Sequence, residues 1–474
     1  MVRNSLRCLA GSALTLVVLA GCSSRSPFTE TFDAKRSRHP QAVRADASTP
    51  SRGYGDQSTP LPVLDETAKL EDYLRYAALE NPGLEAMFQD WKAAVERLPQ
   101  VSTLPDPRFT YGYYLGEVET RVGPMQHSLA LSQTFPWFGK LQDREDAAAR
   151  HANAAYERFE AARLALFLRV ERAYNELFYL KRSIDITHEN IELLQQFERV
   201  VRTRYRVAAA SHPDLIKIQV ELGTLEDRLR QLRDLRDPYG ARLNAALNRP
   251  SGAPVPWPTA VSEREVSVDD ETLLAALSER NPELLALQEE VERERINAEI
   301  ARKDGYPDFT VGLAYTVIGE RNDVSLDENG DDAVLGTLSV NIPIWREKYD
   351  AGVREAMARR LAAAGRRSEA TNRLASELQE ALFEHEDARR RVALYRDTLI
   401  PKATESLQAS LSSFEQGQSD YLDLVDTQRT LLEFQLAIER ALVDRATSAA
   451  RIERLIGVPL IELDDSTDME DQKP

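Results

Sequence analysis

The sequence repeats one order of landmarks, and the second copy follows the first by about 200 residues. Asn81-Pro82 precedes Pro107-Arg108-Phe109-Thr110, and Asn281-Pro282 precedes Pro307-Asp308-Phe309-Thr310. Later landmarks pair in the same order: Phe135-Pro136-Trp137 with Ile342-Pro343-Ile344, Tyr205 with Phe414, Gln219 with Gln428, and Leu247-Asn248-Arg249-Pro250 with Ile456-Gly457-Val458-Pro459. A period this long indicates a duplicated half rather than a solenoid repeat. We therefore expect one folded unit built from two similar halves.

The N-terminal residues 1–21 are predicted to be a signal peptide. Arg3 and Arg7 precede an apolar stretch that is too short to span a bilayer. The stretch ends in Leu19-Ala20-Gly21-Cys22, which resembles a bacterial lipobox. This resemblance implies cleavage before Cys22, acylation of that cysteine and, because Ser23 follows it, sorting to the outer membrane. An ordinary signal peptide with a chance cysteine is the alternative.

Composition excludes several functions and marks the less ordered segments. A formal net charge of −17 argues against a nucleic-acid partner. The six histidines show no metal-ligand spacing, and the sequence has no phosphate-binding loop and no hydrolase or metalloprotease motif. We therefore expect neither a cofactor nor an enzyme. Residues 22–64 are predicted to be a flexible tether, residues 251–268 a linker between the halves, and residues 461–474 an acidic disordered tail.

Four segments alternate apolar residues with small or polar ones: 108–116, 127–135, 308–318 and 334–343. This period places one set on each face of a sheet. Their length of about nine to eleven residues is typical of tilted membrane strands. Polar loops are expected at 117–126 and 320–332, where they would suit an extracellular rim. A half-buried sheet in a soluble protein is the alternative, because alternation does not distinguish lipid from a protein core.

Four strands are too few to close a membrane β-barrel. A lipid-exposed sheet edge is not viable, so a membrane sheet of this size must be completed by other copies of the chain. Three copies would supply twelve strands, which is an ordinary even number.

Long helices are predicted at 140–210, 213–247, 346–415 and 420–456. Heptad-spaced apolar residues indicate coiled-coil packing over many turns. An unbroken helix of about seventy residues would reach on the order of 100 Å. A plain coiled-coil scaffold would explain these helices, but it would not explain the strands.

The junction 135–140 and the two helix-to-helix turns, 204–211 and 413–419, resemble the TolC-like outer-membrane efflux family. The resemblance covers residues 65–460 as two efflux-protein repeats, 65–250 and 269–460. The Phe135-Pro136-Trp137 junction and the lipobox look closest to branches served by resistance-nodulation-division (RND) pumps, with the heavy-metal branch of CusC and CzcC among them.

This resemblance implies a mainly α fold with a small β part. Three copies would form a twelve-stranded transmembrane β-barrel in outer-membrane lipid and a helical α-barrel in the periplasm. The helix-to-helix turns would be tips that dock a periplasmic membrane-fusion adaptor, with these residues as contacts: Val207, Ala208, Ala209, Gln416, Gly417 and Gln418. Ala208 replaces the glycine that is common in such tips, whereas Gly417 keeps it.

Carboxylates beside the tips would form the periplasmic gate in the same family. Asp423 and Asp426 share one helix face, and Asp214 is the counterpart of Asp423 in the first half. Threefold symmetry would make each a ring that favours cations and has raised pKa values. Two exposed helix carboxylates are the alternative. The tyrosine and arginine that latch some relatives are replaced here by Phe414 and Ser419.

The resemblance predicts a passive exit duct of a tripartite efflux pump. An inner-membrane transporter, of RND type, and the adaptor would deliver the substrate and supply the energy. The predicted location is the outer membrane, lipid-anchored and membrane-spanning, with a large periplasmic part. The alternative function is a periplasmic coiled-coil adaptor or scaffold lipoprotein without a pore.

Overall fold

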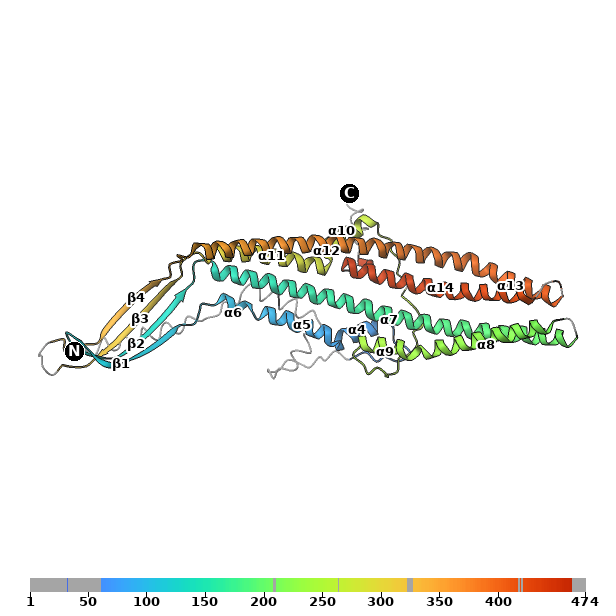
Figure 1. The fold of residues 1–474 in the computed structure, drawn as a ribbon, viewed down its shortest axis with the longest axis horizontal. Coiled ribbons are helices and arrows are strands. Elements are labelled where there is room, and N and C mark those ends of the chain that lie inside the picture. Colours follow the sequence, from blue (N-terminus) through green and yellow to red (C-terminus); the bar gives the residue numbers. More distant parts are fainter. Residues whose placement is uncertain are drawn as a thin grey trace.

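The computed structural model describes residues 32, 61–207, 210–262, 264–321, 327–416, 418 and 421–462. The predicted signal peptide, Cys22, and most of the predicted tether and tail lie outside these residues. The described part is long and narrow, with a small sheet at one end and two helix-to-helix turns at the other (Figure 1). The predicted class, mainly helical with a small four-stranded sheet, is confirmed.

The sheet has the order β1-β2-β3-β4 with every neighbouring pair antiparallel. The strands are β1 (Arg108–Thr120), β2 (Gly123–Phe135), β3 (Phe309–Ile318) and β4 (Ala333–Val340). Strands β2 and β3 join the two repeats side by side, and Phe135 pairs with Phe309 at the helical end. Within the described part of the chain, strands β1 and β4 are therefore the free edges of the sheet.

The predicted polar loop 117–126 is wrong. Strand β1 continues to Thr120 and β2 begins at Gly123, so that only Arg121 and Val122 form the turn. Thr120 pairs with Gly123, whose φ of 132° suits a residue without a side chain. Polar residues continue the ladder here because backbone pairing does not depend on side-chain polarity. Strand β4 also ends at Val340, earlier than the predicted residue 343.

The register separates the two faces of the sheet. One row across all four strands contains Tyr111, Leu129, Tyr315 and Val334. A row on the opposite face contains Ser132, Gly312 and Thr337. One face is thus mostly apolar and the other small or polar.

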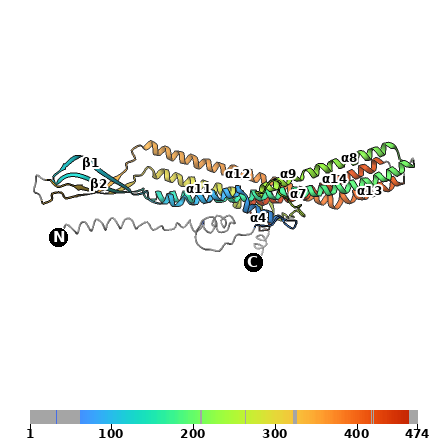
Figure 2. The same ribbon diagram turned by 90° about the horizontal axis from the view of Figure 1, so that it is seen from below.

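The long helices form two hairpins that lie side by side (Figures 1 and 2). The first contains α7 (Lys140–Arg206), α8 (His212–Asp234) and α9 (Arg236–Ala246). The second contains α12 (Arg346–Leu394), the π-helical segment η1 (Tyr395–Leu399), α13 (Ile400–Glu415) and α14 (Tyr421–Ile456). Helix α7 is unbroken over 67 residues.

Two of the predicted long helices are interrupted. The helix predicted at 213–247 breaks at Leu235 because Pro238 lacks an N–H and fits only the first turn of a new helix. The helix predicted at 346–415 contains the π segment immediately before Pro401, which cannot donate a backbone hydrogen bond.

Shorter helices precede the strands of each repeat. They are α4 (Leu70–Glu80), α5 (Pro82–Val95) and α6 (Leu98–Ser102) in the first repeat, and α10 (Asp270–Arg280) and α11 (Pro282–Lys303) in the second. Among the described helices, none has a stretch long and apolar enough to cross a membrane.

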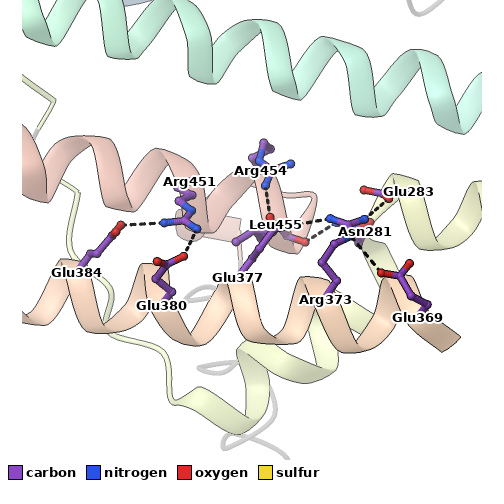
Figure 3. A network of polar contacts seen from close by, with 10 residues as sticks. All are labelled: Asn281, Glu283, Glu369, Arg373, Glu377, Glu380, Glu384, Arg451, Arg454 and Leu455. Carbon is purple, nitrogen blue, oxygen red and sulfur yellow. Dashed lines mark hydrogen bonds and ion pairs between the residues drawn. The ribbon is translucent and has the colours of Figure 1, made fainter. Parts of the chain in front are cut away.

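Among the described residues, three apolar clusters hold the helices together. Phe88, Trp91 and Phe159 pack in the cluster that joins α5 to α7. A second cluster joins the tip halves of the two hairpins, and a third joins α10 and α11 to α12 and α14. Beside the third cluster, Arg451 contacts Glu380 and Glu384 across α12 and α14, as Figure 3 shows. Because Glu380 and Glu384 are exposed, these ion pairs contribute little to the stability of the fold.

Candidate functional site

The two hairpin turns lie together at the end of the molecule opposite the sheet (Figure 1). Val207 is 70% exposed, and Gln416 and Gln418 are also exposed. Ala208, Ala209 and Gly417 lie outside the described residues. The described part of each predicted adaptor tip is thus open to a partner.

Asp214 caps the helix that follows the first turn. Its carboxylate accepts hydrogen bonds from the Ser211 hydroxyl at 2.6 Å and the Ser211 backbone N–H at 3.1 Å. The Ser211 hydroxyl in turn accepts the Asp214 N–H at 3.3 Å, which completes a capping box at the start of α8. Asp214 therefore stabilises the start of α8, and its carboxylate is engaged in this capping box.

Arg204 joins the two tips. Its guanidinium donates to the backbone oxygen of Phe414 and lies 4.8 Å from the centroid of the Phe414 ring. Phe414 meets Tyr421 edge to face, with ring centroids 6.3 Å apart, and both rings are buried. Burial, with a smaller contribution from the negative charge of Glu221, raises the pKa of Tyr421. Phe414, one of the two residues that replace the relatives' latch, therefore packs against the ring of Tyr421, and the other, Ser419, lies outside the described residues.

A groove of about 470 Å³ lies between α8 and α14 next to the tips. Asp423 and Asp426 line it and are exposed, and Lys217 lines it from α8. Asp423 also lies in the first turn of α14, where the helix dipole favours a carboxylate. The structure thus brings two of the three predicted gate acids together, but it also places two basic side chains, Lys217 and Arg429, in the same groove.

The Glu221–Arg429 ion pair connects the two walls of this groove. Nε of Arg429 donates to Glu221 at 3.0 Å, and a second hydrogen bond makes the contact bidentate. The hydrogen bond to Glu221 raises the pKa of Arg429. Sequence reasoning missed this pair. Glu221 lies three residues after Ile218 and four before Leu225, on the face of the helix that carries the heptad-spaced apolar residues. A charged residue on that face indicates a buried ion pair, and this was the signal in the sequence.

The described residues contain no group of three or more histidine, cysteine or acidic side chains that could hold a metal ion. In that part of the chain, the tips and the groove present charged side chains and apolar side chains at the surface.

The model of the outer membrane efflux protein family matches residues 75–249 and 273–458, so the chain belongs to this family. The cobalt-zinc-cadmium resistance protein CzcC of Cupriavidus metallidurans is 22% identical over 406 residues, which cover 82% of this chain and 90% of CzcC. Outer membrane protein TolC of Vibrio cholerae is 21% identical over 399 residues, with coverage of 82% and 90%.

Solved structures have the same fold. The outer membrane protein VceC of Vibrio cholerae has a TM-score of 0.68 to this chain at 17% identity, and the match covers 82% of this chain and 96% of VceC. The predicted family and fold are confirmed. So is the predicted function, because the chain is an outer-membrane exit channel of an efflux system. Members of the family are channels rather than enzymes.

Proposed function

We propose that three copies of the chain form one duct, which completes a tripartite pump from the inner membrane to the outside. The observation that carries this proposal is the open sheet, whose β1 and β4 edges have no partner strand among the residues that the structure describes. An apolar sheet face with free edges is unstable in lipid, so neighbouring copies must pair with those edges. Twelve strands would then surround one channel.

The helices form the periplasmic part of this duct, and lipid attached to Cys22 anchors each copy to the outer membrane. At 1.5 Å per residue, the 67 residues of α7 reach on the order of 100 Å, which suits a path across much of the periplasm. The small and polar sheet face would line the water-filled channel, and the apolar face would contact lipid.

The tips are the proposed docking site for a periplasmic adaptor, with an RND-type pump behind it. The contacts are Val207, Ala208 and Ala209 in one tip and Gln416, Gly417 and Gln418 in the other. The exposure of Val207, Gln416 and Gln418 supports this assignment. The pump selects the cargo, and the channel passes what the pump delivers.

Asp423 and Asp426 are the proposed gate, with Asp214 as a weaker member because its carboxylate is engaged in capping. Repeated three times around the axis, the two acids would form rings that attract cations. Lys217 and Arg429 would moderate their charge because they line the same groove.

The test is conductance of the purified protein in planar bilayers. The wild type should form a pore of low conductance, and Asp423→Ala/Asp426→Ala should raise conductance and reduce cation preference. Glu226→Ala/Asp227→Ala is the matched control, because these acids are exposed on α8 away from the groove lining. A preparation that inserts into bilayers but conducts in neither form would contradict the duct. Equal conductance of the gate and control variants would contradict the gate.

A further inference from the structure

The strand-to-helix junction of the first repeat is locked onto the start of β3. Lys140 is the first residue of α7, and only 4% of its side chain is exposed. Its ammonium lies 2.9 Å from the carboxylate of Asp308, immediately before β3. The same carboxylate oxygen accepts the Trp137 backbone N–H at 2.8 Å. A basic residue at the start of the helix and an acidic residue at the start of the strand therefore join the two repeats here. We call this junction, where β2 with α7 meets β3, the internal seam.

The duplication places a second pair of residues in the equivalent positions. Asp308 follows Pro307 as Arg108 follows Pro107. Lys140 lies four residues after Pro136, and Glu347 lies four residues after Pro343. The acid and the base have thus exchanged places, with the base at the strand and the acid at the helix.

These two residues flank the free edges of the sheet. Arg108 is exposed at the start of β1, and Glu347 follows β4 with 83% of its side chain exposed. Glu347 contacts Arg354 of its own helix at 2.6 Å. Such a surface pair is weak and can be exchanged for a better partner. Arg108 and Glu347 cannot pair with each other in the manner of Lys140 and Asp308 inside one chain, because β2 and β3 separate their strands.

We propose that Glu347 forms an ion pair with Arg108 of the partner subunit, so that each seam between copies repeats the internal seam with reversed charge. This inference rests on the proposed ring of copies. In that ring, β4 lies beside β1 of the next copy as β2 lies beside β3. An arginine and a glutamate can form two parallel hydrogen bonds, which also fix orientation.

The reversed charge makes the seam specific. If β1 of a second copy approached the α7 junction instead, Arg108 would face Lys140. If the α12 junction approached the start of β3, Glu347 would face Asp308. Both encounters bring like charges together, and a guanidinium could not accept the N–H of Trp137. Of these three arrangements of two copies, the β4-to-β1 seam is the one that pairs opposite charges.

The test is a charge exchange in the full-length protein. Arg108→Glu and Glu347→Arg should each reduce the trimer fraction at least fivefold, as measured by native mass spectrometry in detergent. The double variant Arg108→Glu/Glu347→Arg should restore it to within twofold of the wild type. A double variant no better than the single variants would overturn the proposal. A monomeric wild type would contradict the proposed ring of three copies. This result differs from a trimeric wild type whose double variant is not restored, which would contradict the ion pair alone.

Cross-linking provides a second measurement that does not depend on stability. Arg108→Cys/Glu347→Cys, treated with a short bis-maleimide, should give covalent dimers and trimers on denaturing gels, and each single cysteine variant should give none at this seam. Lys140→Cys/Asp308→Cys is the matched control and should cross-link within one chain only. A wild-type-like trimer from which Arg108→Cys/Glu347→Cys yields no intermolecular product would overturn the pairing.

Discussion

Asn281 ties the start of the second repeat to the end of that repeat. Its side-chain N–H donates to the backbone oxygen of Leu455 at 2.8 Å, and its side-chain oxygen accepts the Leu284 N–H at 3.0 Å (Figure 3 draws Asn281 beside Leu455). Asn81 repeats the first contact with the Ala246 oxygen at 2.9 Å. The Asn-Pro landmark is therefore a clamp as well as a helix N-cap.

Asn281→Asp should destabilise the protein by about 2–4 kcal/mol, because it removes the buried donor and places a carboxylate against a carbonyl oxygen. The shift would be measured as the urea midpoint of the helical circular dichroism signal. Asp269→Asn is the matched control, since Asp269 caps α10 at an exposed position and its substitute can accept the same hydrogen bonds. Equal midpoints for the two variants would refute the clamp.

The sequence identified Asn81 and Asn281 as corresponding residues, but it did not indicate which backbone groups their side chains contact. Asn81 and Asn281 stand out as repeated landmarks, but the partner of Asn281 is 174 residues away in sequence. Periodicity predicted the long helices and strands because their patterns are local. It failed at residues 117–126, where hydrogen-bonded pairing extends a hairpin through polar residues.

The candidate site was predicted only where its residues are close together in the sequence. Asp423 and Asp426 are close in sequence and share one groove. The partner of Glu221 is Arg429, 208 residues away in sequence, so no local pattern predicts that partner. The capping box of Asp214 follows a local pattern, because Ser211 stands three residues earlier at the N-cap of α8.

Gly457→Ala should destabilise the end of the second repeat. Gly457 has a φ of 82°, and a Cβ there would lie 2.4 Å from the backbone oxygen of Arg280. The strain and the clash should together cost about 2–3 kcal/mol, measured as a lower melting temperature. Asn248 is the counterpart in the first repeat, with a φ of 56°. Asn248→Gly is the control and should leave the melting temperature nearly unchanged, while a tolerated Gly457→Ala would contradict the clash.

Arg429→Met should loosen the groove between α8 and α14. The variant leaves the carboxylate of Glu221 buried without its ion pair, at a cost of about 1–2 kcal/mol after allowance for the exposure of Arg429. Spin labels at Glu226 and Glu433, in labelled protein diluted with unlabelled protein, should report longer distances than in the wild type. Arg202→Met is the control, because its ion pair with Glu198 lies within α7. An unchanged distance distribution would argue against a clasp across the groove.

Glu171 belongs to a cluster that fastens the linker between the repeats. Arg264 of the linker lies 3.1 Å from Glu171 of α7 and 2.7 Å from Glu453 of α14. Glu171 is buried, and one of its carboxylate oxygens has no hydrogen-bond partner. Burial raises the pKa of Glu171 from 4.5 to about 7, although the charge of Arg264 opposes the shift. Its protonation is therefore coupled to folding near neutral pH.

The stability of the wild type should fall as pH rises from about 5 to 8. A carboxyl whose pKa is higher in the folded state contributes its full stability below the unfolded value, and this contribution is lost as pH rises through the folded value. At about 1.4 kcal/mol per pKa unit, the loss is on the order of 3 kcal/mol. Glu171→Gln should flatten the urea midpoint between pH 5 and pH 8. Glu405→Gln, an exposed control, should keep the wild-type slope. If Glu171→Gln keeps that slope too, the pH dependence originates elsewhere.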